Sequence, residues 1–262
     1  MHDSFRVLHP RLSGPPKAPI SPAHPPLCAT YRDSVSLPLQ GHRGGITCLA
    51  FKRASLQLFS GSNDRTVKVW SLDSLSYIET LYGHQEGVTG VDCLNRERAV
   101  SCGGRDRSVR LWKIVEESQL VFDGAVETCS IDCVDMITET AFFSGSQSGT
   151  LNIWDTQKKK PVASVKHSHG VGNWITSVAA LKFGDVVASG SCDGFVRLWT
   201  CGDAQRKLIA LAAIPLVGFI NGLSFDSAGT KLVAAVGQEH RLGRWQRIKP
   251  ARNGCVEINI LD

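Results

Sequence analysis

The sequence predicts an all-β protein assembled from repeated four-stranded units. Tryptophans recur 42 to 46 residues apart, at Trp70, Trp112, Trp154, Trp199 and Trp245. Each one ends a similar ten-residue frame, and four alternating apolar runs lie between or before these frames. Alternation of this kind is typical of strands that bury one face. Self-similarity at a fixed period of this length indicates a repeat architecture.

The repeated frames contain the signal for a tight turn. They read GSNDRTVKVW (61–70), GGRDRSVRLW (103–112), GSQSGTLNIW (145–154), GSCDGFVRLW (190–199) and VGQEHRLGRW (236–245). Asp-Arg and Asp-Gly pairs mark a turn between the second and third strand of a unit. The apolar runs that supply inner strands are ITCLAF (46–51), VTGVDCL (88–94), WITSVAAL (174–181) and FINGLSF (219–225). We interpret CVEINIL (255–261) as the outer strand of the fifth unit.

These units resemble the WD40 family, whose repeats have this period, begin with Gly-His and end with Trp-Asp. Gly-His occurs at Gly41 and Gly83, and Trp-Asp survives only at Trp154. The resemblance covers residues 41–262. It implies a β-propeller, in which four-stranded blades surround a central channel.

The resemblance also implies a structural hydrogen-bonded network in each blade, formed by His, Ser or Thr, Asp and Trp. The matching residues are His42, Ser60, Asp64 and Trp70 in the first unit, His84, Ser101, Asp106 and Trp112 in the second, and Asp193 and Trp199 in the fourth. The third unit has Ser148 at the Asp position and the fifth has Glu239, so we expect those turns to be held differently. Because a closed polar network satisfies every member, we interpret these histidines as structural and not as metal ligands or catalytic groups.

The two ends of the chain differ in composition. Residues 1–32 hold seven of the eleven prolines and are predicted to be a disordered leader, whereas residues 33–262 form the propeller. DSVSLPLQ (33–40) has the pattern of an outer strand of a blade that would precede Gly41. We therefore expect about five repeats of a seven-bladed ring that lacks two N-terminal blades. The alternative is a five-bladed ring closed by residues 33–40.

Three irregular segments are similar to the WD40 protein family of the U3 small nucleolar ribonucleoprotein, the U3 55-kilodalton protein family. They are residues 103–122, 214–225 and 236–253. The resemblance implies binding to the box B/C region of U3 small nucleolar RNA, association with the box C/D core proteins, and entry into the small-subunit processome. It also implies a role in processing of the ribosomal RNA precursor toward 18S RNA, a nuclear and nucleolar location, and no cofactor.

Positive charge marks candidate contacts to RNA. The net charge is +5, and residues 236–253 hold five cationic side chains against Glu239. Because guanidinium groups bind phosphate and stack on unpaired bases, the candidates are Arg43, Arg65, Arg105, Arg107, Arg241 and Arg244. We expect them to form a basic arc on the rim that carries the turns between second and third strands. The alternative for each is an ordinary solvated side chain.

Other classes of function have weaker support. A scaffold for proteins or modified peptides fits the fold, and Trp174 is the one irregular tryptophan, which we interpret as the start of an inner strand and not as the wall of an aromatic cage. No phosphate-binding loop, catalytic elbow or zinc motif occurs, so we expect no enzyme. His167 and His169 make a weak candidate for a metal site. No apolar run is long enough for a membrane span.

Overall fold

The structure is a computed structural model that describes residues 5–9, 35–124, 129–202, 207–241 and 243–260, without the side chains of residues 5–9, 35–38 and 244. All of its named elements are strands. Among these residues there is no helix with the length and apolar character that a membrane crossing requires.

Four sheets of four antiparallel strands follow one another along the chain, and we call them blades 1 to 4. Blade 1 contains β3 (Ile46–Phe51), β4 (Gln57–Ser62), β5 (Thr66–Ser71) and β6 (Ser76–Tyr82). Blade 2 contains β7 (Val88–Cys93), β8 (Arg98–Gly103), β9 (Ser108–Lys113) and β10 (Ser118–Asp123). Blade 3 contains β11 (Ile131–Met136), β12 (Ala141–Ser146), β13 (Leu151–Asp155) and β14 (Ala163–Val165). Blade 4 contains β15 (Ser177–Ala180), β16 (Val186–Gly190), β17 (Phe195–Cys201) and β18 (Lys207–Pro215).

The fifth sheet has a different plan. Its strands lie in the order β19 (Phe219–Phe225), β20 (Lys231–Gly237), β23 (Gly254–Asn259), and we call it blade 5. Between β20 and β23 the chain forms a separate two-stranded hairpin from β21 (Glu239–His240) and β22 (Gly243–Arg247). We call residues 238–253 the inserted hairpin.

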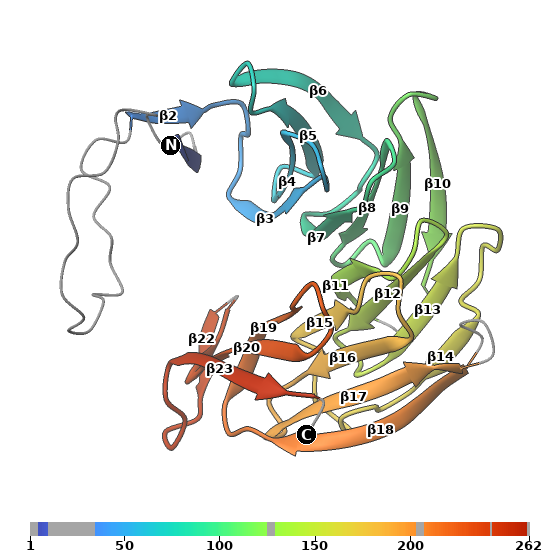
Figure 1. The fold of residues 1–262 in the computed structure, drawn as a ribbon, viewed down its shortest axis with the longest axis vertical. Helices are drawn as coiled ribbons and strands as arrows, with labels where there is room; N and C mark the ends of the chain where they lie inside the picture. The colour runs from blue at the N-terminus through green and yellow to red at the C-terminus, as the bar shows by residue number, and fades with distance from the viewer. Residues whose placement is uncertain (1–4, 10–34, 125–128, 203–206, 242, 261–262) are drawn as a thin grey trace.

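The five blades follow an arc with the first strand of each toward its centre (Figure 1). β3, β7, β11, β15 and β19 are neighbours in that order. Apolar side chains of adjacent sheets fill the space between blades. Between blades 2 and 3, for example, Leu111 and Phe122 pack with Phe142 and Trp154. The predicted all-β propeller arrangement with five blades is therefore confirmed.

The N-terminal strands do not complete blade 5. β2 (Val35–Leu39) pairs with β1 (Phe5–His9), and β23 pairs with β20. The structure therefore does not adopt the alternative of a five-bladed ring closed by residues 33–40. β1 lies inside the leader for which we predict disorder, so that prediction does not describe these five residues. Residues 10–34 of the leader lie outside the described residues.

The prediction that residues 236–245 form the repeat frame of the fifth unit is wrong. The repeat tryptophans pair with the second residue of the preceding strand, as in Leu58↔Trp70 and Val187↔Trp199. In blade 5 the same register is Leu232↔Ile258, so Ile258 occupies the repeat position. Trp245 lies in the inserted hairpin and is 59% exposed. The insertion places Trp245 at the expected spacing by coincidence. β23, which holds residues 255–259 of the segment predicted as an outer strand, is the third strand of blade 5.

The prediction for Trp174 also needs correction. The inner strand of blade 4 begins at Ser177, and Trp174 lies in the loop before it. There the Trp174 ring meets His240 and Trp245 of the inserted hairpin. Sequence alternation could not show this contact, because it depends on a segment about 70 residues further along the chain.

Candidate binding pocket at the mouth of the propeller

The four network residues come together in blades 1 and 2. In blade 1, His42 Nδ1 lies 2.9 Å from Asp64 Oδ2 and Nε2 lies 2.7 Å from Ser60 Oγ, while Trp70 Nε1 donates to the same Ser60 oxygen at 2.8 Å. Blade 2 repeats this geometry with distances of 2.8, 2.8 and 2.7 Å among His84, Asp106, Ser101 and Trp112. Because a carboxylate only accepts, each histidine donates from Nδ1 to its aspartate.

Blade 4 holds a complete network that sequence reasoning found only in part. His169 Nδ1 lies 3.0 Å from Asp193 Oδ1, His169 Nε2 lies 2.7 Å from Ser189 Oγ, and Trp199 Nε1 donates to Ser189 at 2.9 Å. The interpretation of His169 as a weak metal ligand is therefore replaced, and no metal-binding cluster occurs among the described residues. His169 precedes its Asp by 24 residues and not by 22, which hid the match.

Among the described residues, blades 3 and 5 do not show this network, in line with Ser148 and Glu239 at the Asp position of their frames. In blade 3 the Trp154 indole still donates to Ser144 Oγ at 2.8 Å, and Ser148 bonds to Ser146 and Thr150 at 3.0 Å each. In blade 5 neither Glu239 nor Trp245 reaches the equivalent positions, because the inserted hairpin replaces the tight turn.

The networks fix the turns between second and third strands. Arg65 and Arg107 have φ of 70° and 58°, at the position where blades 3 and 4 have Gly149 and Gly194. Asp64 and Asp106 hold these strained turns, for example through the amide of Thr66, which donates to Asp64 at 3.0 Å. Burial opposes ionisation, but hydrogen bonds outweigh it and lower the pKa of both carboxyls to about 2.

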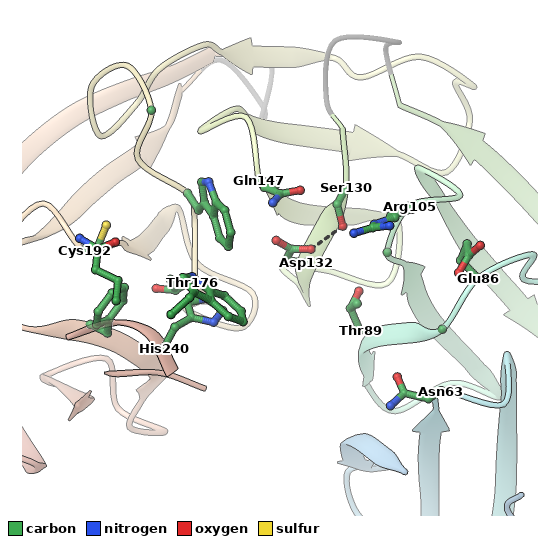
Figure 2. A pocket seen from close by; sticks show the side chains of 17 residues that line it. Asn63, Glu86, Thr89, Arg105, Ser130, Asp132, Gln147, Thr176, Cys192 and His240 are labelled. Atoms are coloured by element: carbon green, nitrogen blue, oxygen red, sulfur yellow. Dashed lines mark hydrogen bonds between the residues drawn. The ribbon is translucent and has the colours of Figure 1, made fainter. Parts of the chain in front are cut away.

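A cavity of about 750 Å³ lies where these turns meet the loops that lead into the inner strands. All five blades contribute to its wall. The lining residues that matter here are Arg105, Asp132, Trp174, Thr176, His240 and Trp245. We call this space the mouth pocket, and Figure 2 shows its polar side chains.

Polar residues stand at the same place near the start of each inner strand. Thr47 Oγ1 donates to the carbonyl of Val88 at 2.5 Å, so that blade 1 is tied to blade 2. Thr89 donates to Ile131 O at 2.7 Å, and Thr176 donates to Ile220 O at 2.6 Å. In blade 3 this place is taken by Asp132, which stands at the same bulge of its strand.

Asp132 is a buried carboxylate in the wall of the mouth pocket. It is 8% exposed, and Ser130 Oγ donates to its Oδ1 at 2.5 Å (Figure 2). Burial raises the pKa of Asp132, while the bond from Ser130 and the charge of Arg241 oppose the rise. Arg241 reaches from the inserted hairpin to donate from Nη2 to the Asp132 carbonyl at 2.9 Å.

An aromatic cluster forms the wall contributed by blades 4 and 5. His240 lies 5.4 Å from Trp245, 5.7 Å from Trp174 and 5.8 Å from Phe219, measured between ring centroids. Burial and the neighbouring Arg241 lower the pKa of His240. Asn221 anchors the hairpin, because its amide donates to Glu239 O at 2.8 Å and its Oδ1 accepts from the Arg241 amide at 2.9 Å.

The predicted arginines divide into groups. Arg105 is exposed and lines the mouth pocket, where Figure 2 shows it beside Ser130. Arg43 and Arg65 are exposed but do not line the pocket, and Arg107 is half-buried. Arg241 is exposed and already donates to the main chain of blade 3. Arg244 lies in β22, and its side chain falls outside the described residues.

The opposite end of the inner strands holds a closed ionic cluster. Lys182 Nζ lies 2.6 Å from Asp92 Oδ2, donates to Met136 O at 2.9 Å, and also pairs with Asp135. The carboxylates accept further bonds from the amides of Met136 and Ala180 at 2.7 and 2.6 Å. Blades 2, 3 and 4 are thereby joined. Neither this cluster nor Asp132 could be predicted from the repeat pattern, since neither lies in the repeat frame.

Comparison with known proteins agrees with this geometry. The WD domain, G-beta repeat family matches residues 34–71, 75–113 and 159–200. Each match begins with the strand that precedes a blade and continues through the first three strands of blade 1, 2 or 4, the blades in which complete networks are described. The fold and the network together define a WD40-repeat propeller.

The relatives are more specific. Two solved structures, of U3-55K and of the RRP9 WD40 repeats, match with a TM-score of 0.84 and 50% identity over 87% of this chain, which covers 72% and 71% of theirs. U3 small nucleolar RNA-interacting protein 2 of Mus musculus is 52% identical over 55% of this chain and 32% of that protein. Ribosomal RNA-processing protein 9 of Saccharomyces cerevisiae is 28% identical over 86% of this chain and 52% of that protein. The chain spans about a third of the mouse relative and about half of the yeast one. It belongs to the WD40-repeat family of U3-55K and RRP9.

Proposed function

We propose that this chain is an RNA-binding WD40 subunit of the U3 small nucleolar ribonucleoprotein, without enzymatic activity. The observation that carries the proposal is the 50% identity to U3-55K across 87% of the chain. In this role it binds the box B/C region of U3 RNA, contacts the box C/D core proteins, and acts in the nucleolus. There it serves small-subunit processome assembly and pre-rRNA processing toward 18S RNA.

The mouth pocket and its rim support RNA contact. Arg105 and Arg241 are exposed at this end of the propeller, and so is Trp245. Guanidinium groups neutralise phosphates, whereas an exposed indole stacks on an unpaired base. Arg43 and Arg65 are exposed near the same turns and extend the positive surface.

A salt titration tests this proposal. The chain is titrated with a U3 box B/C stem and with a scrambled stem at several salt concentrations. We expect selective binding, and each phosphate contact should add about −0.7 to −0.9 to the slope of log affinity against log salt. Arg105→Ala with Arg241→Ala should weaken binding and flatten this slope.

A matched control separates a local contact from general charge. Arg53 is exposed and lines the small cavity at the opposite end of the inner strands. Arg53→Ala should leave the affinity and the salt slope unchanged. Equal binding to both stems would refute the proposal. Equal losses of affinity in the Arg53 variant and in the Arg105 and Arg241 double variant would show that RNA does not bind at the mouth pocket.

A second function, a scaffold that binds proteins through the mouth pocket, is favoured by one observation. Trp174 and Trp245 form a tilted pair, with centroids 5.9 Å apart, in the pocket wall. Such a pair can enclose an apolar or cationic side chain. If partner proteins are recovered with the chain after RNase treatment, and are lost in Trp245→Ala, the scaffold function holds.

A further inference from the structure

Asp132 departs from the rule that its neighbours follow. Thr47, Thr89 and Thr176 each donate a hydrogen bond to the carbonyl of the next blade. An ionised carboxylate has no proton to donate. Among the described side chains, the carbonyl of Ile175, which such a donor would reach, accepts instead from Cys133 Sγ at the long distance of 3.8 Å. A residue that lacks a stabilising contact made at the same position of the other repeats is a candidate functional residue.

The carboxylate of Asp132 is prepared to accept hydrogen bonds from a ligand. It lines the mouth pocket, is 8% exposed, and is held in place by Ser130 through Oδ1. No other partner of the carboxylate occurs among the described side chains. Since each carboxylate oxygen has two acceptor sites, Asp132 retains capacity for two adjacent donors.

The surroundings favour a flat, neutral group over a cation. The cationic Arg241 guanidinium already binds the main chain of Asp132, and Arg105 lines the same pocket. A further cation would be repelled by both. The opposite wall carries the exposed Trp245 ring beside His240, which suits stacking of a planar ligand. Arg105, together with the donors of Arg241 that do not bind the Asp132 carbonyl, can meet an anionic group attached to that ligand.

Guanine has the matching donor pattern. Its Watson–Crick edge presents N1–H and the N2 amino group side by side, so that the two donors match one carboxylate. Adenine and cytosine each present one amino group beside an acceptor, and uracil presents one N–H between two acceptors. Recognition of unstacked bases on this edge, combined with aromatic stacking, is the usual mode for single-stranded RNA.

We propose that the mouth pocket takes one unpaired guanine of an RNA strand, with Asp132 on its Watson–Crick edge, Trp245 on its face, and Arg105 and Arg241 toward the flanking phosphates. This inference rests on the proposed RNA-binding function and assigns one nucleotide to it.

Short RNA strands test the proposal. The full chain is titrated by fluorescence anisotropy with labelled pentanucleotides that differ at the central position: UUGUU, UUAUU and UUIUU, where I is inosine and lacks the N2 amino group. We expect UUGUU to bind about tenfold more tightly than UUAUU, with UUIUU in between. Asp132→Asn should abolish the preference for guanine, so that UUGUU and UUAUU bind with about equal affinity.

Matched variants separate recognition from folding. Asp123 is exposed on the outer strand β10, so Asp123→Asn should keep the tenfold preference. Trp245 is exposed, so Trp245→Ala should leave folding intact and weaken all three strands alike, whereas Trp245→Phe should restore much of the affinity. Circular dichroism melts establish that each variant is folded.

The outcomes distinguish the two proposals. Loss of the guanine preference in Asp132→Asn but not in Asp123→Asn supports the pocket. Selective binding to the U3 stem without any guanine preference in the pentanucleotides, or a preference that survives in Asp132→Asn, overturns the pocket and leaves the proposed function standing. Absence of binding to both the stem and the pentanucleotides overturns both.

Discussion

Asp132 and Asp135 lie three residues apart on β11, yet they belong to opposite ends of the propeller and to opposite kinds of polar site. Asp135 pairs with Lys182 and accepts from the Ala180 amide at 2.6 Å, inside a cluster that joins three blades. Asp132 accepts only from Ser130 among the described side chains and faces a cavity of about 750 Å³.

The difference teaches how one strand serves two purposes. A buried charge whose hydrogen bonds are all made within the protein stabilises the fold and has little left for a ligand. A buried carboxylate with unused acceptors costs stability and is available for binding. The closed end therefore holds the blades together, and the open end is where recognition is expected.

Disrupting the ionic cluster around Lys182 should have the largest effect on stability. Lys182→Met leaves Asp92 and Asp135 buried without their cation, so we expect a loss of about 3–5 kcal/mol in the free energy of unfolding, measured by urea titration. Burial and the charge of Asp92 raise the pKa of Asp135 already, and removal of the lysine raises it further. Because a raised carboxyl pKa costs stability as the pH rises through it, the variant should recover part of the loss as the pH falls.

The control for this variant is a pair at the surface. Lys231 lies 2.5 Å from Glu257, and both side chains are at least half exposed. Lys231→Met should cost less than about 1 kcal/mol. Equal losses in the two variants would show that the cluster does not stabilise the propeller.

The networks within the blades test whether a polar group with more partners contributes more stability. Ser101→Ala removes the partner of both His84 and Trp112, so we expect a loss of about 2–3 kcal/mol. Ser144→Ala in blade 3 leaves only the Trp154 indole without its partner and should cost about 1 kcal/mol. Thermal or urea unfolding measures both, and a larger loss for Ser144→Ala would contradict the ordering.

Lowering the pH should weaken these networks and reduce the free energy of unfolding. The pKa of Asp64 and of Asp106 is lowered to about 2, so each carboxylate contributes stability above its ordinary pKa and loses it as the pH falls toward 2. We expect a loss on the order of 1 kcal/mol for each group, after allowing for partial solvent screening. Unfolding curves between pH 5 and 2 should be flatter for Asp106→Asn than for the unaltered chain. An acid limb with the same slope in both would contradict the assignment.

The smallest expected effect has the opposite sign. Asp132→Thr restores the donor that blades 1, 2 and 4 possess and removes a carboxyl whose pKa burial raises. We expect a gain of about 1 kcal/mol at neutral pH, which shrinks as the pH falls because protonation relieves the cost of the carboxylate. Urea midpoints at pH 7 and pH 4.5 measure this change. A loss of stability at pH 7 would show that Asp132 is a structural residue.

The sequence pattern predicted most of the fold but failed where an insertion occurred. The period identified the blades because four of the five tryptophans are buried at one register position. Trp245 has the same spacing but lies in an extra hairpin, and the spacing of one residue type cannot reveal which strand it occupies. His169 was missed for a related reason, since a loop two residues longer hides its partnership with Asp193.

The candidate site was predicted in part. Arg105 and Arg241 were selected by charge and lie at the mouth of the propeller, whereas Arg107 is half-buried. Asp132 attracts no notice in the sequence, because one acidic residue in a strand is common. Its meaning depends on the threonines at the same position of three other blades, and only alignment of the strands in space reveals that position.

By itself the sequence determined the blades and their turns, because strand alternation and local hydrogen bonds act over a few tens of residues. Only the tertiary structure decided where the mouth pocket lies. Arg241 meets Asp132 across 109 residues, Lys182 meets Asp92 across 90, and Trp174 meets Trp245 in one wall of the mouth pocket. Such contacts follow from the curvature of the stacked sheets, which places distant loops together and which no local pattern encodes.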